Sequence, residues 1–246
     1  MPFKEREETV LEYLRKHREA TVSELCKALF VSEPTIRRDL TKLANAKKII
    51  RTHGGAYYRS TPGENLPQEY REKENAEGKS IIAKKCLSLI NDGDTVMIDA
   101  SSTALPLLRL LGNKSSIVVI TNSTKAPLIL ADTGVKTLLT GGELATNTYG
   151  MVGGYAQSFI ESFNADICFF SVSNLTPDGR LTDNSIAENL VRRVMLSRAR
   201  KKVLMLDSTK IGKPCISTLC TLNDVDLVVC EKDISPQFPS HKEKFV

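Results

Sequence analysis

The sequence predicts an α/β protein with a small N-terminal winged helix-turn-helix domain and a larger domain built on an open, mainly parallel α/β sheet. Three observations predict this fold. Residues 21–56 hold two amphipathic segments and a glycine-containing ribbon, six apolar runs alternate with helical segments further on, and the formal charge is divided unequally between these parts. A chain of 246 residues, 41% of them hydrophobic, can fill two cores. The expected organisation is a small domain at 1–58, a linker at 59–75 and a larger domain at 76–246.

Capping residues and apolar spacing predict the helix-turn-helix. Thr21 and Glu24 match the Thr-x-x-Glu capping box, which satisfies two backbone N–H groups reciprocally at a helix start. Ser32 is an N-cap candidate for a second helix, and Pro34 lies in its first turn, where a missing N–H costs little. The inward stripe of this second helix recurs at i, i+4 and i+7, at Ile36, Leu40 and Leu43.

The outward face of the second helix predicts DNA recognition, because one helix of this kind fits the major groove. At about 100° per residue, Pro34, Arg38 and Thr41 point most directly away from the apolar stripe. Thr35 and Arg37 lie on its flanks. We expect Arg38 to reach a base edge, since arginine can form two hydrogen bonds with guanine.

Other polar residues of the same helix have different expected roles. Arg37 and Lys42 are better placed for phosphates, which supply affinity and register but little sequence information. Asp39 faces nearer the core and is expected to orient a neighbouring side chain. A solvated basic face with no partner is the alternative interpretation of these arginines.

A β-ribbon is expected directly after this helix. Residues 49–52 and 56–58 have the character of strands, and residues 53–55, His-Gly-Gly, supply the bend. Such a ribbon is a wing, on which Arg51 and His53 can follow the DNA backbone. The complete set of predicted DNA-binding residues is Ser32, Pro34, Thr35, Arg37, Arg38, Thr41, Lys42, Arg51 and His53.

The charge distribution favours a polyanionic partner for the N-terminal part. Residues 1–60 hold 13 basic and 8 acidic side chains, whereas residues 61–246 hold 21 of each. The whole formal excess of +5 therefore lies on the proposed DNA-binding domain.

Six apolar runs predict the sheet of the larger domain. Their nearly continuous hydrophobicity is typical of strands covered on both faces, hence of a parallel sheet. These runs are residues 95–99, 116–121, 136–140, 166–172, 202–206 and 226–230. Helical character is expected between them, at residues 77–90, 124–131 and 186–200.

Polar residues follow four of these strands, at the edge where open α/β sheets bind ligands. The segments are 99–103, 121–123, 141–143 and 207–210. Hydroxyls and backbone N–H groups at a helix start form a natural phosphate site, and Lys210 adds a cation. Any one of these segments could instead only cap a helix or form a turn. The occurrence of all four at successive strand ends favours a shared ligand crevice.

The quoted segments resemble one family. TIRRDL and RTHGGA near the N-terminus, with DGDTVMIDASST, VVITNS, LLTGGEL and LMLDSTKIG further on, are similar to the DeoR family of bacterial transcription regulators over nearly the whole chain. The resemblance implies a winged helix-turn-helix and a sensor domain related to ribose-5-phosphate isomerase and glucosamine-6-phosphate deaminase. It further implies that a sugar phosphate or related metabolite binds the sensor loops and changes operator affinity, most often in a repressor.

Carried over to this sequence, the resemblance implies that Ser101, Ser102 and Thr103 hold phosphate and that Asp99, Asn122, Gly141 and Lys210 line the sugar end. The predicted effector-binding residues are Asp99, Ser101, Ser102, Thr103, Asn122, Ser123, Gly141, Gly142 and Lys210.

Five positions depart from the usual family pattern. Phe30 stands in the turn where glycine or a small polar residue is common, and Lys47 replaces a glycine before the wing. Ser101, Ser171 and Asn174 occupy positions that are often glycine. If those positions need a positive φ, serine is disfavoured there, and the crevice is reshaped, binds another effector or is vestigial.

An enzyme related to sugar-phosphate isomerases is the main rival. Asp99, Glu143, Asp183, Glu188 and Lys210 could in principle serve as acid–base groups, but no histidine lies between residues 54 and 240. A DNA-binding protein without an effector, whose α/β domain only mediates assembly, is a third possibility.

The expected partners are double-stranded operator DNA, a small phosphorylated metabolite and other copies of the chain, in a dimer or tetramer. No apolar run approaches the length of a membrane span, and six cysteines without a C-x-x-C pair favour free thiols over a zinc site. A cytoplasmic protein without cofactor or metal is therefore expected.

Overall fold

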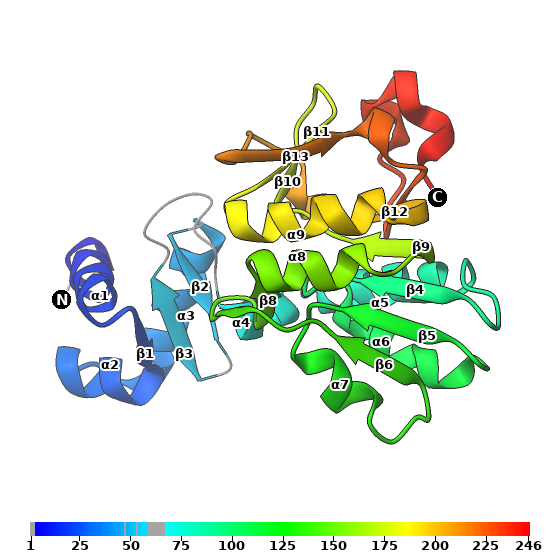
Figure 1. Cartoon of the computed structure of the whole chain (residues 1–246). Helices are drawn as coiled ribbons and strands as arrows, with labels where there is room; N and C mark the ends of the chain where they lie inside the picture. The colour runs from blue at the N-terminus through cyan, green and yellow to red at the C-terminus, as the bar shows by residue number, and fades with distance from the viewer. Residues whose placement is uncertain (1–2, 47, 53, 59–66) are drawn as a thin grey trace. The chain divides into compact units, whose positions relative to one another are not determined.

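The computed structural model describes residues 3–46, 48–52, 54–58 and 67–246, which form parts of two compact units, Met1–Leu66 and Pro67–Val246 (Figure 1). Residues 59–66 of the expected linker lie outside the described residues. The remainder of that segment differs from the expectation, because it belongs to the larger unit and contains helix α4 (Gln68–Lys73). Pro67 stands at the N-cap of α4, so the proline begins a regular element there.

The small unit holds three helices and a three-stranded antiparallel sheet in the order β1-β3-β2. The wing strands are β2 and β3, and the short strand β1 adds a third strand that the sequence pattern did not indicate. The elements are α1 (Phe3–His17), β1 (Glu19–Thr21), α2 (Val22–Leu29), α3 (Glu33–Asn45), β2 (Ile49–Arg51) and β3 (Gly55–Tyr58). Their core contains Val10, Leu14, Leu25, Ile36, Leu40, Leu43 and Ala56.

The predicted capping box is confirmed at α2, where Thr21 Oγ1 accepts from Glu24 N at 3.1 Å and Glu24 Oε2 accepts from Thr21 N at 2.7 Å. Ser32 is the N-cap residue of α3, but its hydroxyl makes no capping bond and instead lies 3.0 Å from Thr35 Oγ1. Phe30 ends α2 in a left-handed conformation, with φ 55°. Its ring is 94% exposed, so the turn is made by a strained, solvated phenylalanine.

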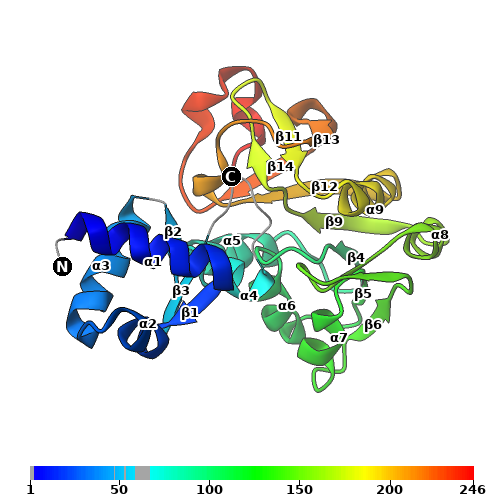
Figure 2. The same ribbon diagram turned by 90° about the vertical axis from the view of Figure 1, so that its left-hand side faces the viewer.

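The large unit is built on a parallel six-stranded sheet in the order β14-β12-β9-β4-β5-β6, which confirms the predicted fold class. All six expected strands are present. They are β4 (Thr95–Ile98), β5 (Val118–Thr121), β6 (Lys136–Leu139), β9 (Ala165–Phe170), β12 (Ala199–Leu206) and β14 (Leu227–Cys230). Helices cover both faces, as Figures 1 and 2 show: α5 (Ala76–Leu87), α6 (Leu105–Leu110) and α7 (Lys125–Leu130) on one, and α8 (Gly154–Glu161) and α9 (Ile186–Ser197) on the other.

Two hydrophobic cores lie on opposite faces of this sheet. Successive residues of one strand alternate between them, so that Phe169 packs in the core of α5, α6 and α7 while Phe170 packs in the core of α8 and α9. This double burial explains why the buried parts of the central strands carry consecutive apolar residues rather than alternating ones.

Smaller elements extend from the strand ends. A hairpin joins β7 (Glu143–Ala145) to β8 (Gly150–Val152), and a second antiparallel sheet has the order β10-β11-β13. That sheet comprises β10 (Asn174–Leu175), β11 (Arg180–Asp183) and β13 (Ser217–Thr221). The 3-10 helices are η1 (Leu111–Asn113), η2 (Ser208–Lys210), η3 (Leu222–Asp224), η4 (Ser235–Gln237) and η5 (Pro239–Lys244). Across the described ranges, no helix is both long and apolar enough to cross a bilayer.

Candidate functional site

Helix α3 exposes most of the predicted DNA-binding residues. Arg38 makes no hydrogen bond or ion pair with the described residues, so its guanidinium is available to a partner. Thr35 is half-buried. The exposed members are Ser32, Pro34, Arg37, Arg38, Thr41 and Lys42.

Two acidic residues orient basic side chains around this face. Arg37 Nη2 lies 2.6 Å from Glu33 Oε1 one turn earlier, so a phosphate that binds Arg37 competes with a weak, exposed ion pair. Asp39 is buried and pairs with Arg6 of α1, whose Nη2 donates to Asp39 Oδ1 at 3.1 Å. Asp39 therefore joins α3 to α1, in agreement with the expectation that it orients a neighbour.

Arg51 on the wing has a buried Nη1 that lacks a hydrogen-bond partner among the described residues. Burial, and then the positive charge of Arg37, lower the pKa of Arg51. Arg37 on α3 and Arg51 on β2 thus create a positive potential around Arg51. A DNA phosphate oxygen bound there would accept a hydrogen bond from the unpaired Nη1 of Arg51. The predicted contact of His53 lies outside the described residues.

The polar segments after β4, β5 and β6 lie next to one another at the carboxyl edge of the parallel sheet, where the ligand crevice was predicted. Asp99, Ser101, Ser102, Thr103, Asn122 and Ser123 are all buried there. Gly141 and Gly142 are exposed beyond the end of β6. A Cβ on Gly142 would lie 2.4 Å from Val152 O, so the close approach of β8, rather than a ligand, requires glycine there.

The three residues at positions that are often glycine in the family cause no backbone strain. Neither Ser101 nor Ser171 nor Asn174 has a positive φ. Ser101 N instead donates to Asp99 Oδ1 at 3.1 Å and Ser171 N donates to Asp99 Oδ2 at 3.2 Å. The concern that serine distorts the crevice therefore does not apply to this backbone.

Two lysine side chains converge beside the segment Ser101–Thr103, and one of them also contacts the backbone of Arg71. Lys210 Nζ donates to Thr103 Oγ1 at 3.2 Å and to Ser171 Oγ at 3.0 Å. Lys79 Nζ donates to the carbonyl of Arg71 and lies 3.5 Å from Ser102 Oγ. Burial, followed by the charges of Lys79 and Arg71, lowers the pKa of Lys210 to about 8. A bound anion would stabilise the cationic form of Lys210, which burial disfavours.

The sequence analysis did not identify Lys79 or Arg71. One signal was available for Lys79, which lies on the buried face of α5 with Ile82, Ala83 and Cys86 and is only 2% exposed. A lysine within an apolar helix face requires a partner, because desolvation of its charge is costly. Arg71 gave no such signal, since it lies in the segment expected to be linker.

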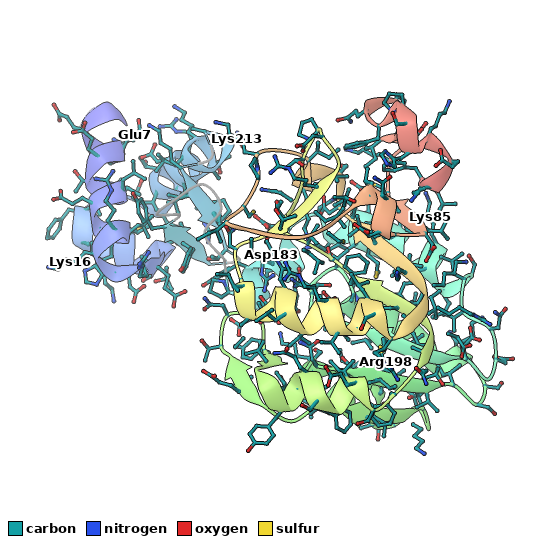
Figure 3. The ribbon with its side chains drawn as sticks, turned by 45° about the horizontal axis from the view of Figure 1, so that its top comes forward. Glu7, Lys16, Lys85, Asp183, Arg198 and Lys213 are labelled. Atoms are coloured by element: carbon teal, nitrogen blue, oxygen red, sulfur yellow. The ribbon has the colours of Figure 1, made fainter. Side chains whose placement is uncertain are left out.

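On the side of the crevice toward α9, Arg192 gathers three carboxylates. Its Nε donates to Asp99 Oδ2 at 2.9 Å, its Nη1 donates to Asp183 Oδ2 at 3.0 Å, and its Nη2 lies 3.7 Å from Glu188 Oε1. Asp183 lies beside the first turn of α9 (Figure 3). Burial opposes ionisation of Asp183, but the charge of Arg192, the hydrogen bonds from Ser185 and Ser173 and the charge of Lys210 together outweigh it, so the pKa of Asp183 is lowered.

This arrangement bears on the rival enzymatic interpretation. Four of its five candidates, Asp99, Asp183, Glu188 and Lys210, lie in or beside the crevice, whereas Glu143 is exposed on β7. Arg192 holds these three carboxylates in hydrogen bonds and ion pairs, which suits recognition of hydroxyl groups better than proton abstraction.

Five buried side-chain atoms around the crevice lack hydrogen-bond partners within the described part of the chain. Each such atom costs about 1–3 kcal/mol when nothing satisfies it. They come from α4 and from the ends of β4, β5 and β6, and they comprise Gln68 Oε1, Ser101 Oγ, Asn122 Oδ1, Ser123 Oγ and Thr140 Oγ1. Two amide oxygens and three hydroxyls are a suitable lining for a ligand that carries several hydroxyl groups.

Metal binding has no comparable support. Within the described residues, no group of three or more His, Cys, Asp or Glu side chains could hold a metal ion. All six cysteines are free.

Known proteins resemble the chain along most of its length. Family profiles match at residues 6–61, for the DeoR-like helix-turn-helix domain, and at residues 74–232, for the DeoR C terminal sensor domain. The transcriptional regulator GolR of Listeria innocua is 34% identical over 235 residues, covering 95% of this chain and 92% of its own. The glycerol-3-phosphate regulon repressor of Escherichia coli is 29% identical over 225 residues, covering 91% of this chain and 89% of its own.

A likeness of fold extends to a solved structure of different function. Translation initiation factor eIF-2B of Pyrococcus horikoshii OT3 has a TM-score of 0.52 at 16% identity, covering 94% of this chain and 82% of that chain.

Proposed function

The chain belongs to the DeoR family of transcriptional regulators, and on that premise we propose that it is a repressor whose larger unit binds a small phosphorylated polyol or sugar. Ligand binding in the crevice changes the affinity of the small unit for its operator. One observation carries the proposal: Lys79 and Lys210 contact Ser102 and Thr103 at the sheet edge where five buried polar atoms have no partner within the described residues.

The two ends of the crevice suit the two ends of such a ligand. The phosphate binds Lys210 and Lys79 and the hydroxyls of Ser102 and Thr103, since charge-assisted hydrogen bonds to phosphate are short and strong. The hydroxyl-bearing end satisfies the unpaired atoms at Asn122 and its neighbours. Glycerol 3-phosphate is the first compound to test, because the Escherichia coli relative is named for its regulon.

At the DNA, the proposal assigns base recognition to Arg38 and phosphate contacts to Arg37, Lys42 and Arg51. Association of two copies through their larger units would present two recognition helices to half-sites about 34–36 Å apart, or multiples of that. The same symmetry predicts a palindromic operator.

A titration with matched variants tests the sensor role. Fluorescence anisotropy with DNA from upstream of the gene gives operator affinity in the presence of glycerol 3-phosphate, glucose 6-phosphate and their unphosphorylated counterparts. We expect one phosphorylated compound to weaken operator binding, and Lys79→Met to remove that response. Lys84→Met, on the exposed face of the same helix, is the control.

Two other results would replace the proposal. Operator binding that no compound changes, with no thermal stabilisation by any of them, favours an assembly role for the α/β unit. Aldose–ketose conversion of a sugar phosphate by the purified chain, lost in Glu188→Gln, favours an enzyme.

A further inference from the structure

Helix α4 is tied to the walls of the effector crevice through four of its six residues. Gln68 Nε2 donates to Ala100 O at 3.1 Å, and Arg71 Nη2 donates to Asn147 O at 3.1 Å. Glu69 accepts from Tyr149 Oη at 2.7 Å, and Glu72 pairs with Lys125 Nζ at 2.5 Å. This short helix is therefore a wall of the ligand site, although it precedes the sensor domain in the sequence.

Asn75 connects the end of α4 to the loop that carries Lys210. Its backbone is left-handed, with φ 46°, which asparagine tolerates better than most residues. Its Nδ2 donates to Asp207 Oδ1 at 2.9 Å and to Glu231 Oε1 at 3.0 Å. One amide thus contacts residues that follow β12 and β14, two neighbouring strands of the sheet.

The same two carboxylates fix the backbone around Lys210. Asp207 Oδ1 accepts from Thr209 N at 2.9 Å. Glu231 Oε2 accepts from Ser208 N at 3.1 Å. Asn75, Asp207 and Glu231 therefore hold the lysine loop as one hydrogen-bonded unit.

Packing on α5 holds the Asn75 side chain in this position. A Cβ built on Gly78 would lie 2.5 Å from Asn75 Nδ2, so only glycine leaves room for the amide. Asn75 O also accepts from Lys79 N at 3.0 Å, at the start of the helix that carries the second cation of the site. The backbone of Asn75 thereby joins both lysine-bearing elements to α4.

We propose that Asn75 is a positioning residue that makes the docking of α4 depend on occupancy of the anion site. The inference rests on the proposed function and names its regulation. Lys79 Nζ links the anion site to α4, because it donates to the carbonyl of Arg71 and lies 3.5 Å from Ser102 Oγ. A phosphate bound beside Ser102 holds Lys79 Nζ in place and thereby stabilises its bond to α4, while Asn75 keeps the lysine loop in register with the helix.

This arrangement supplies a physical path toward the DNA-binding unit. Residues 59–67 separate the last strand of that unit from α4 in the sequence, so α4 is the first element of the larger unit that the chain reaches after the DNA-binding unit. A ligand shifts such an equilibrium only by its difference in affinity between the two states. The bond from Lys79 Nζ to the Arg71 carbonyl provides that difference.

Hydrogen–deuterium exchange of the full chain, with inorganic phosphate as the probe, tests the proposal. The peptides of interest cover 67–74, for α4, and 99–103, for the anion site. At about nine times the dissociation constant for phosphate, exchange through local opening is expected to slow about tenfold at both segments in the wild-type chain.

Asn75→Gly deletes the amide and retains a left-handed backbone. In this variant we expect phosphate to slow exchange of residues 99–103 as much as in the wild type. The slowing at residues 67–74 should fall to less than about twofold. Asn75→Asp, which turns the donor into a carboxylate facing Asp207 and Glu231, is the second variant and is expected to show the same split. Asn113→Gly, at an exposed position of η1, is the control for a general effect of Asn→Gly.

Each outcome decides between the two proposals. Equal phosphate protection of 67–74 in the wild type and in the folded Asn75 variants overturns the coupling and leaves the anion site intact. Protection of neither segment in the wild-type chain overturns the proposed site and the coupling with it. Loss at 67–74 alone supports a positioning role, since a purely structural defect would change both segments.

Discussion

The ammonium group of Lys210 donates a hydrogen bond to Thr103 Oγ1 across 3.2 Å, so the loop after β12 meets the loop after β4. Strand β9 lies between these two strands in the sheet, and the lysine therefore spans the end of a neighbouring strand. A hydroxyl and an ammonium held at this distance can both bind one phosphate, the first by hydrogen bonding and the second by charge.

Lys210→Met tests the charge while it largely retains the length of the side chain. We expect binding of the phosphorylated effector to weaken by about 10–100-fold, corresponding to about 1.5–3 kcal/mol for a hydrogen bond to a charged group. Operator affinity in the absence of effector should not change. Isothermal titration calorimetry measures the first quantity and anisotropy the second. Lys213→Met, an exposed lysine three residues further on, is the control, and an equal loss in both variants would contradict the assignment.

The lowered pKa of Lys210 predicts how effector binding depends on pH. Lys210 is cationic below a pKa of about 8 and loses its charge as the pH rises through that value. A phosphate monoester gains its second negative charge at about pH 6. Affinity should therefore be highest between about pH 6 and 8 and fall above it, whereas Lys210→Met should lose the decline on the alkaline side. Titrations of effector affinity at intervals of half a pH unit from pH 5.5 to 9.5 measure this. If the affinity of the variant still falls above pH 8 as in the wild type, a group other than Lys210 causes the decline.

The sequence predicted the sheet better than it predicted the ligand site, for a physical reason. Five of the six strands contain a buried and nearly continuous apolar run that was recognisable from its own residues, whereas the edge strand β6 is partly exposed. The hairpin β7–β8 and the sheet of β10, β11 and β13 have short strands of mixed burial, which carry no comparable local pattern.

Lys79 and Arg71 belong to the site through contacts that only the folded chain creates. Lys79 reaches Ser102 from 23 positions away along the chain, and Arg71 reaches Asn147 from 76 positions away. Lys210 could be anticipated because it follows a recognisable strand, whereas Arg71 stood in a segment whose prolines suggested a linker.

Arg38→Ala and Arg51→Ala should separate base recognition from phosphate contact. Loss of Arg38 is expected to cost about 1–3 kcal/mol on the specific operator and to relax base preference at one position. Loss of Arg51 should weaken binding to specific and random DNA about equally and reduce the slope of affinity against salt by about one. Anisotropy on both DNAs across salt concentrations measures these effects. Equal losses of Arg38→Ala on the two DNAs would assign Arg38 to the backbone instead.

Phe30→Gly should stabilise the DNA-binding unit, because Phe30 combines a left-handed backbone with an almost fully solvated ring. That conformation costs a non-glycine residue about 1–2 kcal/mol, and the ring recovers little of it by burial. Glycine relieves the strain but loses more backbone entropy on folding, so the expected net gain is about 0.5–1 kcal/mol.

Thermal unfolding followed by circular dichroism measures this gain, and Phe30→Ala is the matched control. Alanine removes the ring and keeps a Cβ in the left-handed region, so it should give no comparable stabilisation. Equal stabilisation by both substitutions would show that the exposed ring, and not the backbone, is unfavourable. A loss of operator affinity in both variants would show in addition that the ring contacts DNA, since Phe30 stands in the turn directly before α3.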